Sequence, residues 1–140
     1  MCIRDSKETD PMHVTLDNPT AAPRPLGPYS QVARVQLADG SALLYLSGQI
    51  AEGADIAEQT HGVFATLTAL LQAHGATLAD IINIRTFLTD MDDLPGYAAV
   101  RRTYLTGTPP TSTTVSVPRL FRPEALIEVE VVASCAAGRP

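Results

Sequence analysis

Apolar residues recur at three- and four-residue intervals in two stretches of the chain, which is the spacing of one face of a helix. The first stretch spans residues 54–74, and its apolar face carries Val63, Leu67, Leu70, Leu71 and His74. Gly75 follows it as a natural stop. The second stretch spans residues 93–105, with Leu94, Tyr97, Val100 and Tyr104 on one face. The pattern therefore predicts two helices, each packed on a core through one side.

Segments rich in apolar and β-branched residues surround these helices and predict the strands of a sheet. The first two strands are expected at residues 30–37 and 42–47, joined by a tight turn at Asp39-Gly40. A third strand is expected at residues 81–88, between the two helices, as a central strand buried on both faces. Two further strands close the domain as a hairpin, and the second of them carries Glu128.

The resulting order, ββαβαββ, predicts an α+β fold in which a single sheet is covered by two helices on one face. Leu, Ile and Val side chains on the opposite face cannot remain in water, so the pattern also predicts an oligomer. A length of 140 residues suits one domain. We expect residues 1–17 to form a disordered or non-native tail, residues 18–135 the folded domain, and residues 136–140 a short C-terminal tail.

Composition and charge narrow the class of protein. Apolar runs stay far shorter than the roughly 18 residues that cross a bilayer, so a cytoplasmic protein without membrane contact is expected. Cys2 and Cys135 lie at opposite ends of the chain, which favours free thiols in a reducing compartment. The net charge of −5 and the scattering of ten Lys and Arg residues disfavour nucleic-acid binding. The adjacent pair Arg101-Arg102 is interpreted as part of a solvated, charged helix face.

Metal ions and nucleotide cofactors are not expected. His61 and His74 are thirteen positions apart and have no carboxylate in ligand register. His74 is interpreted as a last-turn residue that interacts favourably with the helix dipole. Neither Gly27 nor Gly48 belongs to a phosphate-binding loop, because no Gly-rich turn followed by Lys and Ser or Thr is present.

Three short runs carry a family resemblance: Gly27-Pro28-Tyr29-Ser30-Gln31, Ser47-Gly48-Gln49 and Pro110-Thr111-Ser112-Thr113-Thr114-Val115. Together with Ile127-Glu128-Val129-Glu130 they resemble the Rid family, also called RidA/YjgF, of small imine and enamine deaminases. The resemblance extends over roughly residues 18–133. It implies the chorismate-mutase-like version of the fold and a homotrimer without cofactor, whose small-molecule ligand binds in clefts between neighbouring subunits.

The resemblance also implies roles for individual residues. Glu128 matches the glutamate that positions water and transfers the proton, and Tyr29 matches a tyrosine of the pocket. On a strand, Glu128 and Glu130 point to the same side, which without the resemblance would be interpreted as a solvated face. Ser47 and Gly48 are expected to line the cleft, with Ser47 capping the end of its strand.

Two positions depart from the pattern of the deaminating members. Their third run reads Pro-Ala-Arg-Ser/Thr, and its arginine binds the substrate carboxylate, whereas this chain has Ser112 at that position. An asparagine of the second helix is replaced by Ala98. A serine hydroxyl lacks the charge and the two-pronged donor geometry of a guanidinium. Arg122, in the loop before the Glu128 strand, is the substitute guanidinium that the sequence suggests.

Three hypotheses for the function follow. The first is an imine or enamine hydrolase that acts on a substrate other than amino-acid-derived 2-imino acids, because Ser112, Thr114 and Ala98 suggest a neutral or hydroxylated ligand. The second is a non-catalytic trimer that binds a metabolite in its clefts. The third is a 2-iminobutanoate/2-iminopropanoate deaminase that uses Arg122 or binds its substrate weakly.

Overall fold

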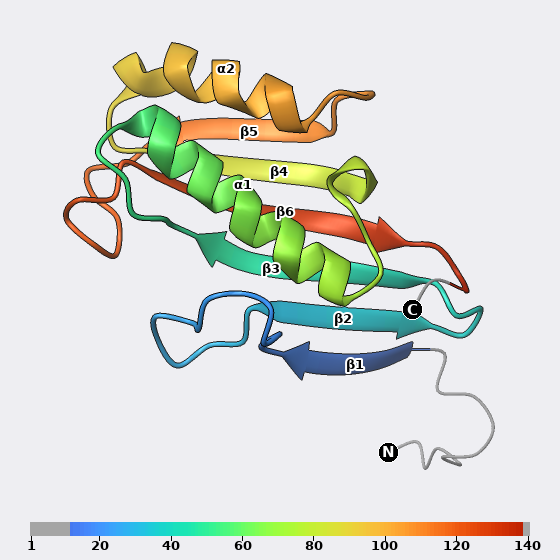
Figure 1. Ribbon diagram of the computed structural model, residues 1–140. Coiled ribbons are helices and arrows are strands. Elements are labelled where there is room, and N and C mark those ends of the chain that lie inside the picture. Colours follow the sequence, from blue (N-terminus) through green and yellow to red (C-terminus); the bar gives the residue numbers. More distant parts are fainter. Residues whose placement is uncertain (1–11, 139–140) are drawn as a thin grey trace.

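A six-stranded sheet with two helices on one face makes up the computed structural model, which describes residues 12–138 (Figure 1). The strands run in the spatial order β1-β2-β3-β6-β4-β5. Their bounds are Met12–Asp17 (β1), Val32–Leu37 (β2), Ala42–Gln49 (β3), Ile81–Leu88 (β4), Thr111–Ser116 (β5) and Ile127–Cys135 (β6). The helices are Ile56–Ala73 (α1) and Leu94–Tyr104 (α2), with short 3-10 turns at Leu78–Asp80 (η1) and Met91–Asp93 (η2).

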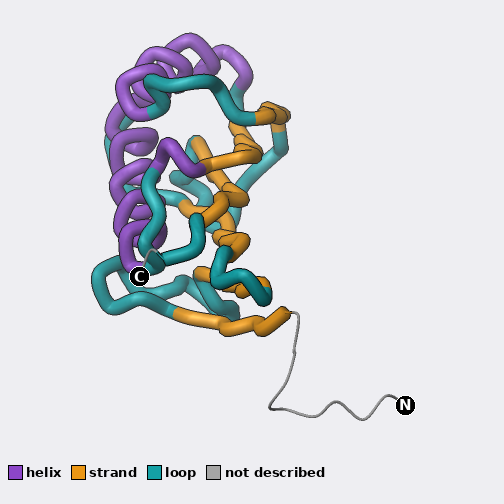
Figure 2. Tube along the Cα trace, turned by 90° about the vertical axis from the view of Figure 1, so that its right-hand side faces the viewer, coloured by secondary structure: helices purple, strands orange, loops and turns teal. Residues whose placement is uncertain are grey.

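Both helices lie on the same side of the sheet, and Figure 2 shows the two layers edge-on. Neighbouring strands are antiparallel except β4 and β5, which are parallel. The α+β class, the single sheet and its one-sided cover by two helices are therefore confirmed. The predicted helices and the strand at residues 81–88 lie within one or two residues of their observed bounds.

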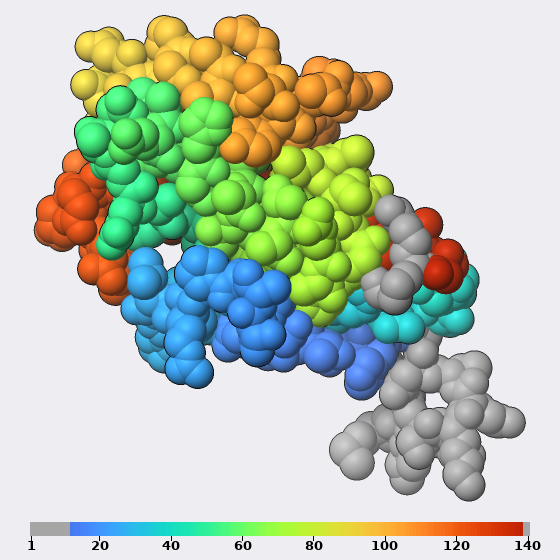
Figure 3. Space-filling model, viewed as in Figure 1, coloured from blue at the N-terminus to red at the C-terminus, as the bar shows by residue number. Residues whose placement is uncertain are grey.

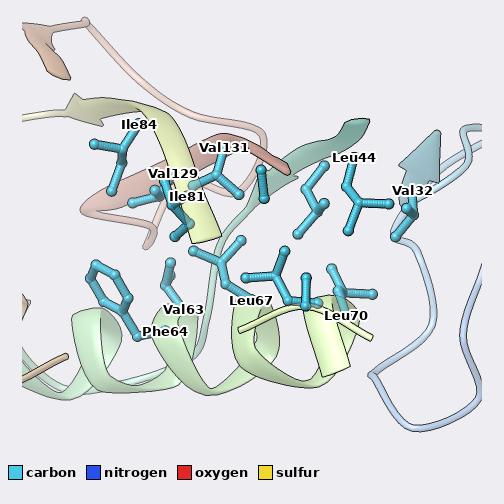
Figure 4. Close-up of a cluster of buried hydrophobic side chains, with 14 of the residues drawn as sticks. Val32, Leu44, Val63, Phe64, Leu67, Leu70, Ile81, Ile84, Val129 and Val131 are labelled. Carbon is cyan, nitrogen blue, oxygen red and sulfur yellow. The ribbon is translucent and has the colours of Figure 1, made fainter. Parts of the chain in front are cut away.

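The apolar stripe of α1 forms the centre of the core (Figure 4). Val63, Phe64, Leu67 and Leu70 are all fully buried and face Val32, Leu44, Ile84, Val129 and Val131 of the sheet. Each such side chain contributes about 1.5–3 kcal/mol by leaving water. This packing fixes which side of each strand faces the helices.

The N-terminal strand β1 was not expected. Residues 12–17, predicted as part of a tail, pair with β2 from Met12↔Leu37 to Asp17↔Val32. Apolar and polar residues alternate in Met-His-Val-Thr-Leu-Asp, which is a strand pattern of period two. The order is thus βββαβαββ, and residues 1–11 of the predicted tail lie outside the described residues.

The last two strands do not form the predicted hairpin. The loop after β5 carries the chain across the sheet, so that β6 lies between β3 and β4 while β5 stays at the edge beside β4. Nor is β4 buried on both faces within one protomer, since Ile82 is 45% exposed. Within residues 12–138, no helix covers this second face of the sheet.

Exposed apolar side chains gather on this uncovered face. Direct cross-strand partners point to the same side of a sheet, and Leu16 pairs with Ala33, which pairs with Tyr45. The exposed members on β1, β2 and β3 are Met12, Val14, Leu16, Leu37 and Tyr45. Such a contiguous patch is typical of an interaction surface.

The C-terminus of α1 attaches β1 to the rest of the molecule. His74 caps the helix and is buried, and its Nε2 lies 2.9 Å from Asp17 Oδ2 of β1. Arg34 Nη1 of β2 donates to the His74 carbonyl at 3.0 Å. His74 therefore joins β1 and β2 to the helix layer, a role that its place in the last turn did not indicate.

No helix within residues 12–138 combines the length and the apolar character needed to span a bilayer.

The stop of α1 gives a direct test of the fold. Gly75 has a φ of +78°, and a side chain in this left-handed region costs about 1–2 kcal/mol. Gly75→Ala should lower the free energy of unfolding by that amount, measured by thermal or denaturant unfolding at fixed protein concentration. Gly107→Ala is the matched control, because the added Cβ meets no atom within 4 Å there. Equal stability of the two variants would contradict the assignment of Gly75 as the helix stop.

Candidate functional site

A cavity of about 410 Å³ opens where the end of β3 meets the start of β6. We call it the β3–β6 pocket; the residues of its lining that matter below are Tyr29, Ser47, Gly48, Phe121, Glu128 and Glu130. Figure 3 shows a hollow between the blue segment that precedes β2 and the green segment that follows β3. The pocket brings together the first and second runs of the sequence with the glutamate strand.

Glu128 reaches this pocket because β6 alternates between the two faces of the sheet. Ile127 and Val129 are buried under α1, and Glu128 and Glu130 point away from it as half-buried side chains. The predicted common side for the two carboxylates is confirmed. Burial raises the pKa of the Glu128 carboxyl, and the negative charge of Glu130 raises it further.

Gly48 provides the space that this carboxyl group occupies. The register between β3 and β6 shifts between Leu46 and Gln49, which brings the Gly48 backbone against Glu128. A Cβ at position 48 would lie 2.7 Å from Glu128 Oε1. Any larger residue would therefore have to displace the carboxylate.

Ser47 and Tyr29 form the wall of the pocket beside the loop that precedes β2. Ser47 Oγ donates a hydrogen bond to the Ser30 carbonyl at 2.7 Å, so its hydroxyl ties β3 to that loop. Tyr29 Oη accepts a hydrogen bond from the Leu26 amide at 3.2 Å, and 41% of the residue remains exposed. The tyrosine hydroxyl thus lies at the mouth of the pocket, within a folded loop.

Ser112, Thr114 and Ala98 lie elsewhere in the protomer, between α2 and β5. Ser112 and Thr114 are register partners of Ile84 and Thr86, both of which are buried on the helix side of β4. A second cavity of about 230 Å³, the α2–β5 pocket, is lined by Ala98, Arg101 and Thr114 among others. Within one protomer, Tyr29, Ser47, Gly48 and Glu128 thus line one pocket and Ala98 and Thr114 line another, with Ser112 on β5 beside the second.

Arg122 belongs to neither pocket. It is exposed in the loop before β6, where Phe121 is the residue that contributes to the β3–β6 pocket. Among the described residues, Arg122 contributes to the lining of neither pocket, and its role as a substitute guanidinium stays a prediction.

Arg101 is a lining residue of the α2–β5 pocket that the motifs did not indicate. Its Nη1 donates to Ser112 Oγ at 3.0 Å and to Tyr97 Oη at 3.1 Å. Arg101 is half-buried beside the Tyr97 ring, so it is not a fully solvated charge, whereas Arg102 is exposed. The available signal was its spacing, since Tyr97 and Arg101 are one helical turn apart and therefore share a face of α2.

Within residues 12–138, no group of three or more His, Cys, Asp and Glu side chains could hold a metal ion.

Comparisons with known proteins give a consistent result. Residues 19–135 match the model of the family described as Endoribonuclease L-PSP. A RutC family protein of Saccharolobus solfataricus is 38% identical over 120 residues, covering 80% of this chain and 90% of that protein. A 2-iminobutanoate/2-iminopropanoate deaminase of Dermatophagoides farinae is 29% identical over 119 residues, covering 79% and 88%.

Solved structures agree with the fold. Rv2704 of Mycobacterium tuberculosis, a member of the YjgF/YER057c/UK114 family, matches with a TM-score of 0.69 and 30% identity, covering 75% of this chain and 85% of that one. TdcF of E. coli, solved with bound serine, matches with a TM-score of 0.75 and 27% identity, covering 87% and 99%.

The electrostatics of the β3–β6 pocket can be tested without a substrate. Glu130→Gln removes the neighbouring negative charge, so the pKa of Glu128 should fall, while burial keeps it above its ordinary value. The pKa of Glu128 in the wild-type protein and in Glu130→Gln is measured from the carboxyl carbon NMR signals during a pH titration. Glu124→Gln, a change at an exposed residue of the preceding loop, is the control. An unchanged or raised pKa of Glu128 in Glu130→Gln would contradict this account of the pocket.

Proposed function

Because the chain belongs to the Rid (YjgF) family, matched here by the Endoribonuclease L-PSP model, we propose that it hydrolyses imines or enamines of small metabolites and releases ammonia. The observation that carries the proposal is Glu128, a half-buried carboxyl group with a raised pKa, held against Gly48 in a pocket of ligand size. The deaminase relative from Dermatophagoides farinae supports the same class of reaction.

The proposed step adds water across the C=N bond. The water oxygen bonds to carbon while Glu128 accepts one proton from the water and passes it to the nitrogen, which gives a neutral carbinolamine. The hydroxyl proton of the carbinolamine is then transferred through the same carboxylate to the nitrogen, the C–N bond breaks, ammonia leaves and a carbonyl group forms. A raised pKa suits both halves of this cycle, because the carboxyl group then holds and yields a proton closer to neutral pH. Tyr29, at the mouth of the pocket, would orient the substrate.

We further propose a homotrimer in which the two pockets of neighbouring protomers form one cleft. Two features support assembly: the uncovered apolar face of the sheet, and the separation of the predicted site residues between opposite regions of one protomer. A site that uses both Glu128 and Ser112 would need two chains. The subunits would also cover the exposed side chains of β1, β2 and β3.

The class of substrate depends on whether a guanidinium lies near position 112. The expectation of a neutral ligand assumed that none does, and the contact between Arg101 and Ser112 removes that premise. Amino-acid-derived imines therefore return as substrates to be tested beside neutral imines. We expect Thr114 and Ala98 to line the part of the cleft that binds the substrate.

Metabolite binding without catalysis is the second candidate function. The serine bound to E. coli TdcF favours it, because that protein is similar over 87% of this chain. Nucleic acid is a less suitable ligand despite the family's description as an endoribonuclease, since a net charge of −5 provides no basic surface for a phosphate backbone.

The test is the hydrolysis of imines generated in solution, with ammonia release followed above the spontaneous rate. One imine should carry a carboxylate, such as 2-iminobutanoate, and one should be neutral. Glu128→Gln keeps the shape of the side chain but cannot accept a proton, so it should lower the rate about 10²–10⁴-fold. Glu124→Gln should remain as active as the wild-type protein.

Two outcomes would contradict the proposal. An unchanged rate in Glu128→Gln would exclude the carboxyl group from the reaction. A wild-type protein that binds a small metabolite but accelerates the hydrolysis of neither imine would support metabolite binding instead.

A further inference from the structure

We propose that Arg101 of α2 is the carboxylate-binding residue of this protein, taking the place of an arginine on β5. The inference rests on the proposed function, because it specifies the substrate class of the same cleft: small imines or enamines that carry a carboxylate group. Arg101, which the sequence pattern placed on a solvated helix face, would then determine the specificity for a carboxylate.

The position of the guanidinium is fixed by two hydroxyl groups. Ser112 Oγ accepts from Nη1 at 3.0 Å, and Tyr97 Oη accepts from the same nitrogen at 3.1 Å. Tyr97 is itself anchored, because its hydroxyl lies 2.6 Å from Thr86 Oγ1 of β4 and the residue is only 1% exposed. The guanidinium is therefore held at the edge of β5 by a chain of hydrogen bonds that ends in the core.

Within residues 12–138, the remaining donors of Arg101 have no partner. A guanidinium carries five N–H donors, and the two contacts above use only those of Nη1. Among the described residues, no protein group accepts from Nε or Nη2, and no carboxylate forms an ion pair with this side chain. Nε and Nη2 together form the two-pronged edge that binds a carboxylate through parallel hydrogen bonds.

The surroundings leave room for such a group. Arg101 lines the α2–β5 pocket of about 230 Å³ with Ala98 and Thr114. The methyl group of Ala98 occupies little of the space one turn before Arg101 on the helix, and Thr114 adds a hydroxyl group from the strand. A carboxylate on Arg101 would be desolvated on one side and hydrogen-bonded on the other, which strengthens the contact relative to an exposed ion pair.

In this arrangement, Ser112 positions the Arg101 guanidinium and does not itself bind the substrate carboxylate. A serine cannot bind a carboxylate with charge, but its oxygen accepts from a guanidinium and directs it. The strand position then orients the binding group that the helix supplies. Ser112 is thus a positioning residue, and Arg101 makes the contact.

The experiment compares binding of a carboxylate with binding of its neutral amide by isothermal titration calorimetry. The probes are 2-oxobutanoate, the product expected from 2-iminobutanoate, and 2-oxobutanamide. The wild-type protein should bind the carboxylate at least about tenfold more tightly. Arg101→Gln should lower the affinity for 2-oxobutanoate by about 10–100-fold and leave the affinity for the amide unchanged.

Further variants separate a specific contact from a general effect of charge or folding. Arg101→Lys keeps the charge but loses the two-pronged geometry, so its affinity for the carboxylate should fall between those of wild type and Arg101→Gln. Ser112→Ala leaves the guanidinium in place without one of its acceptors and should weaken carboxylate binding by a smaller factor. Arg119→Gln removes the same charge from an exposed loop residue and should bind as wild type.

The outcomes distinguish this inference from the proposed function. Equal affinity of the wild-type protein for carboxylate and amide, or a loss caused by Arg122→Gln rather than by Arg101→Gln, would overturn the role of Arg101. Carboxylate binding that depends on Arg101 in a protein that hydrolyses neither imine would uphold Arg101 and refute the hydrolase. Hydrolysis that depends on Glu128 but does not change when Arg101 is replaced would uphold the hydrolase and refute the role of Arg101.

Discussion

The burial of the α1 stripe against the sheet is the interaction on which the rest of the structure depends. Because Leu67 and its neighbours meet Ile127, Val129 and Val131 on one side of β6, the residues between them must point to the other side. Glu128 consequently enters the β3–β6 pocket. A shift of β6 by one residue would place this carboxylate in the core and destroy both packing and site, so stability and chemistry constrain the same register.

The two pockets depend differently on this core. The β3–β6 pocket is built from the backbone: a register shift in β3, a glycine that approaches the glutamate, and a loop closed by a serine hydroxyl. The α2–β5 pocket is built from side chains, where Tyr97 links the buried Thr86 to Arg101. The position of the Glu128 carboxyl group therefore does not depend on which side chains line the α2–β5 pocket.

At position 112, the sequence lacks an arginine, but the folded protein still has a guanidinium beside this position. In the sequence, the third run has Ser112 where an arginine is expected, and this absence of a guanidinium predicts a neutral ligand. In the folded chain, a guanidinium from the facing helix lies 3.0 Å from that serine. A carboxylate-binding site requires a guanidinium at one place in space, and either α2 or the adjacent β5 can supply it. The exposed apolar side chains on the face without helices are a further nonlocal feature, because they come from three strands that meet only in the folded sheet.

By itself, the sequence determined both helices, the strand at residues 81–88 and the shared side of Glu128 and Glu130, because periodicities of 3.6 and 2 depend only on local backbone geometry. The family runs added Tyr29, Ser47 and Gly48 to one pocket. Tertiary structure alone decided the attachment of β1 through Asp17 and His74, the insertion of β6 between β3 and β4, and the contact of Arg101 with Ser112. Each of these features is a contact between different secondary-structure elements. A local sequence pattern does not specify which strand pairs with a given edge or which side chain binds a given guanidinium.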